Sequence, residues 1–212
     1  MSHFFSQTDF QNFNNRFRTN FFNSIVGFKS LNLAGSISKT GHHNLAIFSS
    51  IFHIGSNPAY LGMIFRPNEE VPRHTLANIL ETGFYTFNHV DESFYKQAHH
   101  TSAKYDMDQS EFEACGLEPY FLDFFPAPFV KQSQVKMGLS FVEKQELKFN
   151  NTILLVGKVE VAILPQSIIS DDGFVDISKA NSLAGMGIDG YAKVENVTRL
   201  SYSKVGEQPL EI

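Results

Sequence analysis

A two-residue alternation of side chains recurs in four separate stretches of this chain and constrains its fold more than any other feature. The stretches are residues 31–38, 43–50, 135–141 and 153–163. A period of two places alternate side chains on opposite faces of a β-strand, so each stretch is expected to be a half-buried strand. Short turn sequences such as Thr40-Gly41 separate consecutive stretches, which predicts antiparallel hairpins.

Shorter elements occupy the rest of the chain. Apolar and aromatic runs over residues 60–66 and 84–90 predict two further strands, and helical spacing predicts short helices over 75–81, 91–100 and 110–115. The sequence contains no parallel β-α-β series and no GxGxxG motif, which disfavours a dinucleotide-binding fold. We therefore expect a mainly β protein: an antiparallel β-barrel with short peripheral helices.

Composition restricts the classes of partner and compartment. The chain carries a formal net charge of −5, and broad nucleic-acid binding needs a basic face, so no nucleic-acid partner is expected. No apolar run approaches the ~20 residues needed to span a membrane, and the first residues do not resemble a signal peptide. The single cysteine, Cys115, is typical of a reducing compartment. These features predict a soluble, cytoplasmic protein without a membrane partner.

Phenylalanines near the N-terminus recur with a helical period. Phe10, Phe13, Phe17 and Phe21 are three, four and four residues apart, which predicts one apolar face on an amphipathic helix over residues 1–20. Residues 21–212 are then expected to form a single domain. The apolar face can dock on the chain's own barrel or on a partner subunit, and the periodicity does not choose between them.

Metal and nucleophile chemistry have little support. The adjacent pairs His42-His43 and His99-His100 diverge on a strand or helix, and neither HExxH nor CxxC is present, so no metal site is expected. The sequence also lacks GxSxG, and Cys115 has no evident activating partner, which argues against a hydrolase.

Hydroxyl side chains and arginines gather at the expected ends of elements. Hydroxyls and free backbone N–H groups at such places suit a phosphate, and a guanidinium adds paired donors. Each residue alone is more typical of a helix cap or of solvated surface. The candidates for an anion site are Ser49, Ser50, Ser56, Thr75, Thr101, Ser102, Arg66 and Arg73.

The order of several short motifs resembles the flavin reductase-like family, whose fold is the FMN-binding split barrel. The segment NLAIFSS, a later Asn-Pro and an apolar strand ending in Arg-Pro are similar to the family's opening. The blocks VPRHTLANILETGFYTFNHV, HHTSAKYDMDQSEFEACGL and IDGYAKVENVTRLSY resemble its later segments. Ile47 and Ala59 depart from the family pattern, which often has proline at both positions.

The resemblance implies a cofactor and a set of residues that bind it. The implied cofactor is FMN, with FAD as an alternative flavin. Asn44 and Ala46 would lie beside the ring, the polar residues after them would hold the phosphate or ribityl end, and the loop after residue 100 would close the site. The implied cofactor-binding set is Asn44, Leu45, Ala46, Ser49, Ser50, Asn57, Arg66, Thr75, Thr101 and Ser102.

Three functions remain open on the sequence alone. The first is an NAD(P)H-dependent flavin reductase, an oxidoreductase in which hydride passes from nicotinamide to flavin, with the histidines near residues 42 and 99 as candidates to line the nicotinamide side. The second is a non-enzymatic FMN protein that passes electrons to a protein partner. The third is a flavin-free β-barrel binding module. The family resemblance also implies a homodimer with the flavin site near the subunit interface.

Overall fold

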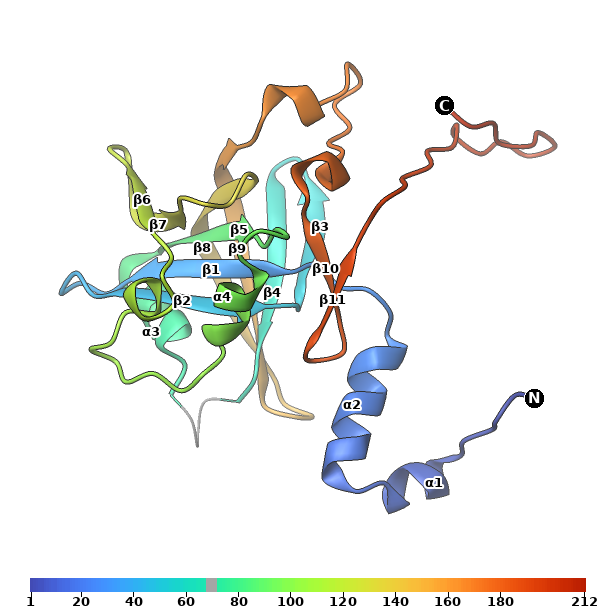
Figure 1. Cartoon of the computed structure of the whole chain (residues 1–212), viewed down its shortest axis with the longest axis horizontal. Helices are drawn as coiled ribbons and strands as arrows, with labels where there is room; N and C mark the ends of the chain where they lie inside the picture. The colour runs from blue at the N-terminus through green and yellow to red at the C-terminus, as the bar shows by residue number, and fades with distance from the viewer. Residues whose placement is uncertain (68–71) are drawn as a thin grey trace.

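The computed structural model describes residues 1–67 and 72–212, and its centre is a seven-stranded antiparallel sheet (Figure 1). The strand order is β2-β1-β5-β8-β9-β4-β3. The strands are β1 Asn32–Ile37, β2 His43–Phe48, β3 Ile51–Ser56, β4 Ala59–Phe65, β5 Phe84–His89, β8 Lys136–Leu147 and β9 Thr152–Ile163. The expected mainly β, antiparallel architecture is confirmed.

Smaller elements surround this sheet. Two short hairpins lie outside it, and the helices pack at its faces and ends. The hairpin strands are β6 Pro119–Leu122 with β7 Phe125–Val130, and β10 Leu183–Met186 with β11 Gly190–Lys193. The helices of the body are α3 His74–Thr82, α4 Tyr95–His100 and α5 Glu111–Ala114, with 3-10 helices at Gln166–Ile168 and Ile177–Ala180.

Strand β1 is buried on both faces, so the expectation that residues 31–38 are half-buried was wrong. One reason is its place in the sheet, since β1 pairs with β2 on one side and β5 on the other. On one face Ala34 joins an interior cluster with Met63 and Phe87. On the other face Leu33 joins a cluster that includes residues of α4 and α5. Helices and strands remote in sequence therefore cover the face that would otherwise meet water.

Several elements differ from the expectation from sequence. Strand β3 was not expected; it forms because it pairs with β4 along the sheet edge. The helix expected over 91–100 begins only at Tyr95, because Asp91 accepts hydrogen bonds from Ser93 N and Oγ and forms a turn there. Hairpins β1–β2 and β8–β9 lie where the alternation placed them.

The N-terminal segment has two helices in place of the single one expected over residues 1–20. Helix α1 spans Gln7–Asn12 and α2 spans Asn15–Ile25. The break follows from Phe13, whose ψ of 132° is extended, and from Asn14, whose side chain accepts the Phe17 N–H and starts α2 afresh. The phenylalanines fold onto one another across this break, with ring centroids 4.5 Å apart for Phe13 and Phe17.

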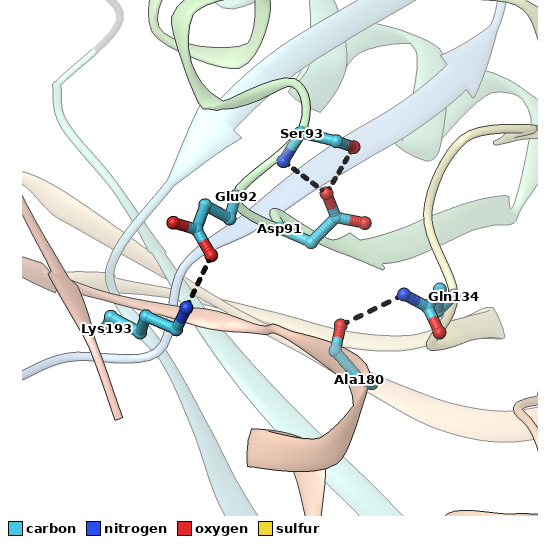
Figure 2. Close-up of polar contacts among 6 residues, drawn as sticks. All are labelled: Asp91, Glu92, Ser93, Gln134, Ala180 and Lys193. Carbon is cyan, nitrogen blue, oxygen red and sulfur yellow. Dashed lines mark hydrogen bonds and ion pairs between the residues drawn. The ribbon is translucent and has the colours of Figure 1, made fainter. Parts of the chain in front are cut away.

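The C-terminal part of the body is fastened to the turn after β5 and to the loop between β7 and β8 (Figure 2). Lys193 Nζ of β11 lies 2.8 Å from Glu92 Oε2, and Gln134 Nε2 donates to the Ala180 carbonyl at 3.3 Å. After Lys193 the chain leaves the body, as does the N-terminal helical pair, and both ends project on the side where β3 and β10–β11 lie (Figure 1).

Candidate functional site

A buried cluster of four polar side chains joins β1, β2 and the first turns of α3. Asn44 Nδ2 donates to Thr75 Oγ1 at 2.8 Å, and Asn78 Nδ2 donates to Ser36 Oγ at 3.2 Å. Asn44 Nδ2 also lies 3.5 Å from Ser36 Oγ. All four side chains are buried. Buried amides and hydroxyls that hydrogen-bond one another hold fixed positions, as a binding site requires.

Local sequence explains how this cluster is placed. Ser36 and Asn44 are direct partners in the β1–β2 register, so their side chains meet on the same face of the hairpin. Thr75 and Asn78 are three residues apart and share one face of α3. Helix α3 is oriented by Leu76 and Ile79, which are buried in the interior cluster, and it ends at Gly83 in the left-handed conformation with φ 79°.

A cavity of about 280 Å³ lies beside the polar cluster. Its wall comes from β2, the β1–β2 turn, α3 and the loop between α4 and α5. The lining residues are Ser38, Thr40, His42, His43, Asn44, His74, Asn78, Met107 and Asp108. Partial burial lowers the pKa of His43, while Glu113 opposes this shift and the neighbouring His42 adds to it. The imidazole of His43 is therefore held toward its neutral form.

Arg66 lies near two other cations, Lys29 and Arg73, and Arg73 directly precedes α3. Burial, and next the charge of Arg66, lower the pKa of both Lys29 and Arg73. Lys29 Nζ donates to the Gly187 carbonyl, and Arg73 donates to the Pro67 carbonyl. Among residues 1–67 and 72–212, none of the three cations pairs with a carboxylate. A cluster of cations without a counter-charge favours an anion.

The N-terminus of α3 adds backbone donors at the same place. Arg73 is its N-cap residue and makes no side-chain cap hydrogen bond. The first N–H groups of a helix have no intrahelical acceptor, and the helix dipole favours negative charge there. Cations that pair with no carboxylate of the described residues, a nine-residue helix without a side-chain N-cap and the Thr75 hydroxyl fit a phosphate-bearing cofactor such as FMN.

The expected site residues fall into two groups, and the larger group surrounds this end of the barrel. Asn44 and Thr75 are in direct contact. The Ser50 carbonyl accepts the Ile64 N–H, so Ser50 lies beside the end of β4, two residues before Arg66. Ser49 lies near Gly185, whose neighbour across the sheet is Lys29. Ala46 follows Asn44 on the same face of β2.

The remaining expected residues are placed differently. Asn57 is in the β3–β4 turn, about 20 Å along the strand from Arg66. Within one subunit, Asn57 and Arg66 therefore do not contact the same part of a ligand. The hydroxyls of Thr101 and Ser102 donate to the carbonyls of Ala98 and His99 at the end of α4. Leu45 points into the core, and its backbone N–H donates to Glu111.

A buried carboxylate holds β2 in position. Glu111 Oε2 accepts the Leu45 N–H of this edge strand at 2.9 Å, and among the described residues β1 is the one strand paired with β2. Burial raises the pKa of the Glu111 carboxyl, and the backbone N–H groups of Leu45 and Glu111 oppose the shift. Glu111 therefore acts as a substitute for a neighbouring strand at this point.

Sequence reasoning missed Lys29, Ser36, Asn78 and His74 as site residues. The three-residue spacing between Thr75 and Asn78 is a signal that could have identified Asn78. Lys29 reaches the site only because β10 pairs with the segment before β1, through the Lys29–Gly185 bridge. No local pattern carries that information.

The seven-stranded antiparallel sheet with short peripheral helices is the architecture of a split barrel, and polar and cationic side chains of β2, α3 and the segment after β4 lie at one end of it. The family model described as flavin reductase like domain matches residues 31–173. The chain belongs to the flavin reductase-like family, and its role is that of a flavin-related oxidoreductase with a flavin cofactor.

Solved structures with the same fold cover nearly the whole chain. A Shewanella frigidimarina protein described as a flavin reductase with a split barrel domain is 44% identical, with a TM-score of 0.91 over 95% of this chain and 100% of that one. Component B of nitrilotriacetate monooxygenase from Bacillus cereus has a TM-score of 0.82 at 18% identity, over 94% and 100%. The 2-nitrobenzoate 2-nitroreductase of Pseudomonas fluorescens has a TM-score of 0.80 at 16% identity, over 97% and 99%.

Neither a group of metal-ligand side chains nor a membrane-spanning helix occurs among residues 1–67 and 72–212. No group of three or more His, Cys, Asp or Glu side chains is placed to hold a metal ion. No helix in the same part of the chain is long and apolar enough to cross a membrane.

Proposed function

We propose that this protein binds FMN at the α3 end of the barrel and reduces flavin with NAD(P)H as hydride donor. The observation that carries the proposal is the Asn44–Thr75 contact, which joins β2 to the uncapped start of α3 beside the Arg66 and Arg73 cations. When bound, the flavin supplies the ring that accepts hydride or electrons. The name of the Shewanella protein, at 44% identity, supports the same activity.

The residues of this chain contribute binding and orientation. Arg66, Arg73 and Lys29 would neutralise a phosphate dianion, and the first N–H groups of α3 would donate to its oxygens. Asn44 and Thr75 would fix the polar chain next to the phosphate, with Ala46, Ser49 and Ser50 further along the chain. The cavity lined by His42, His43 and His74 would receive the second reactant.

A flavin titration tests the cofactor proposal. FMN fluorescence should be quenched on binding, and the Arg66→Ala/Arg73→Ala variant should bind at least ~100-fold more weakly, because two charge-assisted contacts are lost. Lys144→Ala/Lys148→Ala makes the same change in charge at exposed positions of the β8–β9 hairpin and should bind normally. Equal affinities for all three proteins would contradict the proposed site. Competition between FMN and FAD identifies the preferred flavin.

An electron-transfer protein is the second candidate, because the sequence contains no recognisable nicotinamide-binding motif. In that case the same flavin site would serve a protein redox partner. Rapid mixing of the flavin-loaded protein with NADH or NADPH discriminates the two. Fast loss of the flavin absorbance is expected for the reductase, and indifference to both donors would favour the carrier.

The protein is also proposed to act as a cytoplasmic homodimer, with residues 21–212 as one domain. Support comes from the N-terminal helical pair. Neither α1 nor α2 contains a buried residue, although six of their neighbouring phenylalanine rings contact one another. An apolar surface of this kind is typical of a subunit interface. The Phe-rich face is expected to complete its burial against a second subunit.

A further inference from the structure

The last fourteen residues form a small hairpin that stands away from the body (Figure 1). Ser201 N donates to the Leu210 carbonyl at 2.8 Å, and Ile212 N donates to the Arg199 carbonyl at 3.1 Å. The Glu207 N–H closes the turn on the Lys204 carbonyl. We name residues 199–212 the tail hairpin.

The tail hairpin carries large apolar side chains that are exposed to solvent. Its large apolar side chains are mostly exposed, with Tyr202 at 90% and Leu210 at 71% of full exposure. Among the described residues, its hydrogen bonds and ion pairs with the body are made by Arg199 alone, which pairs with Asp172 and lies over the ring of Phe174. An isolated two-stranded hairpin is marginal in water, so this one needs a surface to cover it.

The chain exposes more surface than a compact monomer of its mass, and the excess estimates the area that a partner could bury. The accessible surface is 13341 Å². A compact monomer of 23.9 kDa would expose about 9,900 Å². The excess is about 3,400 Å², which exceeds the roughly 1,000–2,500 Å² that each subunit buries in an obligate dimer. The two projecting ends of the chain therefore leave enough surface for a dimer interface.

The edge strand β3 offers a matching apolar surface. Phe52 and Ile54 are 44% and 45% exposed, and both lie over Gly62 of β4, where a Cβ would come within 2.5 Å of the Phe52 ring. Within residues 1–67 and 72–212, β4 is the single strand that pairs with β3, so the other edge of β3 is open to a further strand beyond Ile51, whose carbonyl accepts the Ser30 hydroxyl. Both chain ends project on the side of the body where β3 lies (Figure 1).

We propose that the tail hairpin of each subunit docks on the β3 face of a second copy of this chain, around Phe52 and Ile54. A second copy is the occupant because one chain supplies both surfaces, so a two-fold axis buries each of them twice. The tail carries two basic and two acidic side chains, Arg199, Lys204, Glu207 and Glu211, which gives no charge preference for an anionic lipid or nucleic acid. This inference rests on the proposed homodimer.

Cross-linking between two separately prepared variants tests the docking. In a Cys115→Ser background, full-length chains carrying Val205→Cys are mixed with chains carrying Ile54→Cys and treated with a short bismaleimide. A covalent product of twice the chain mass is expected from the mixture. A third variant, Met107→Cys, is exposed on the loop between α4 and α5 and should give no product with Val205→Cys.

A second measurement separates docking from folding. Leu200→Ser/Tyr202→Ser should raise the dimer dissociation constant at least tenfold in sedimentation, while Lys204→Ser/Glu207→Ser in the turn should leave it unchanged. Both variants should keep the melting temperature of the body, since the tail packs little on it. A stable dimer that gives no cross-link between the Val205→Cys and Ile54→Cys chains would overturn the docking but not the homodimer. A monomer at all concentrations would overturn the homodimer as well.

Discussion

At the scale of single residues, the Asn44–Thr75 hydrogen bond is the contact on which the proposed flavin site depends. It links a strand residue and a helix residue 31 positions apart and leaves the Thr75 hydroxyl proton free to donate to a ligand. Its geometry is protected by burial, since both side chains are almost inaccessible to water. A change at either residue should alter ligand binding more than it alters folding.

Asn44→Leu and Thr75→Val should each weaken FMN binding by about 10- to 100-fold, the effect of losing one or two hydrogen bonds to a charged or polar ligand. Titration of flavin fluorescence measures the dissociation constants. Thr152→Val is the control, because that hydroxyl donates to Asn150 Oδ1 in the β8–β9 hairpin and not to the polar cluster. Unchanged affinity in both test variants would refute the assigned roles.

His89 provides a pH-dependent contribution to stability. Burial lowers the pKa of His89 from 6.5 to about 4. The unfolded chain therefore binds this proton more tightly, and stability present above pH 6.5 is lost as the pH falls toward 4. The loss from this residue is expected to be about 2–3 kcal/mol.

Urea unfolding at pH 7 and pH 4.5 measures this contribution. His89→Gln should lose less free energy of unfolding between the two pH values than the wild type. The exposed His53 serves as the control, and His53→Gln should match the wild type. Identical pH dependence in all three proteins would mean that the His89 proton is not linked to folding.

At the scale of elements, β2 carries the site but is an edge strand. It is held on its inner side by β1 and on its outer side by Glu111 of α5, which accepts the Leu45 N–H. The four-residue helix α5 is itself anchored by Phe112, which is buried in the hydrophobic cluster that contains Leu33. The position of Asn44 therefore depends on a carboxylate 67 residues later in the chain.

Glu111→Ala should weaken FMN binding about tenfold and destabilise the protein by roughly 1–3 kcal/mol, because a buried N–H of β2 loses its acceptor. Flavin titration and thermal unfolding measure the two effects. Glu113→Ala changes an exposed carboxylate of the same helix and should have little effect on either. If both variants behave alike, the Glu111–Leu45 bond does not position β2.

At the scale of the whole molecule, the ends of the chain carry apolar surface that the barrel does not bury. Deleting residues 1–20 removes α1 and the first half of α2 and is expected to weaken dimerisation, since the Phe-rich face is lost. Sedimentation over a range of concentrations measures the effect. A dimer of unchanged affinity would assign the interface to other surfaces.

Much of the barrel could be predicted from local pattern. The alternation in residues 31–50 and 135–163 predicts the hairpins β1–β2 and β8–β9, because the side-chain period and the turn residues are properties of neighbouring positions. Strand β3 could not be predicted in this way, since IFHIGS has no clear period and is a strand only because β4 pairs with it. The helix break at Phe13 likewise needed the Asn14 cap.

By itself, the sequence determined the antiparallel β class, the family and the chemical types of the site residues, because periodicity, turn residues and ordered motifs depend on neighbours along the chain. Only the tertiary structure decided that Asn44 meets Thr75, that Lys29 joins Arg66 and that Glu111 supports Leu45. It also separated Asn57 from Arg66. These relations are set by sheet register and by the packing of remote elements, and neither is encoded in a local stretch of sequence.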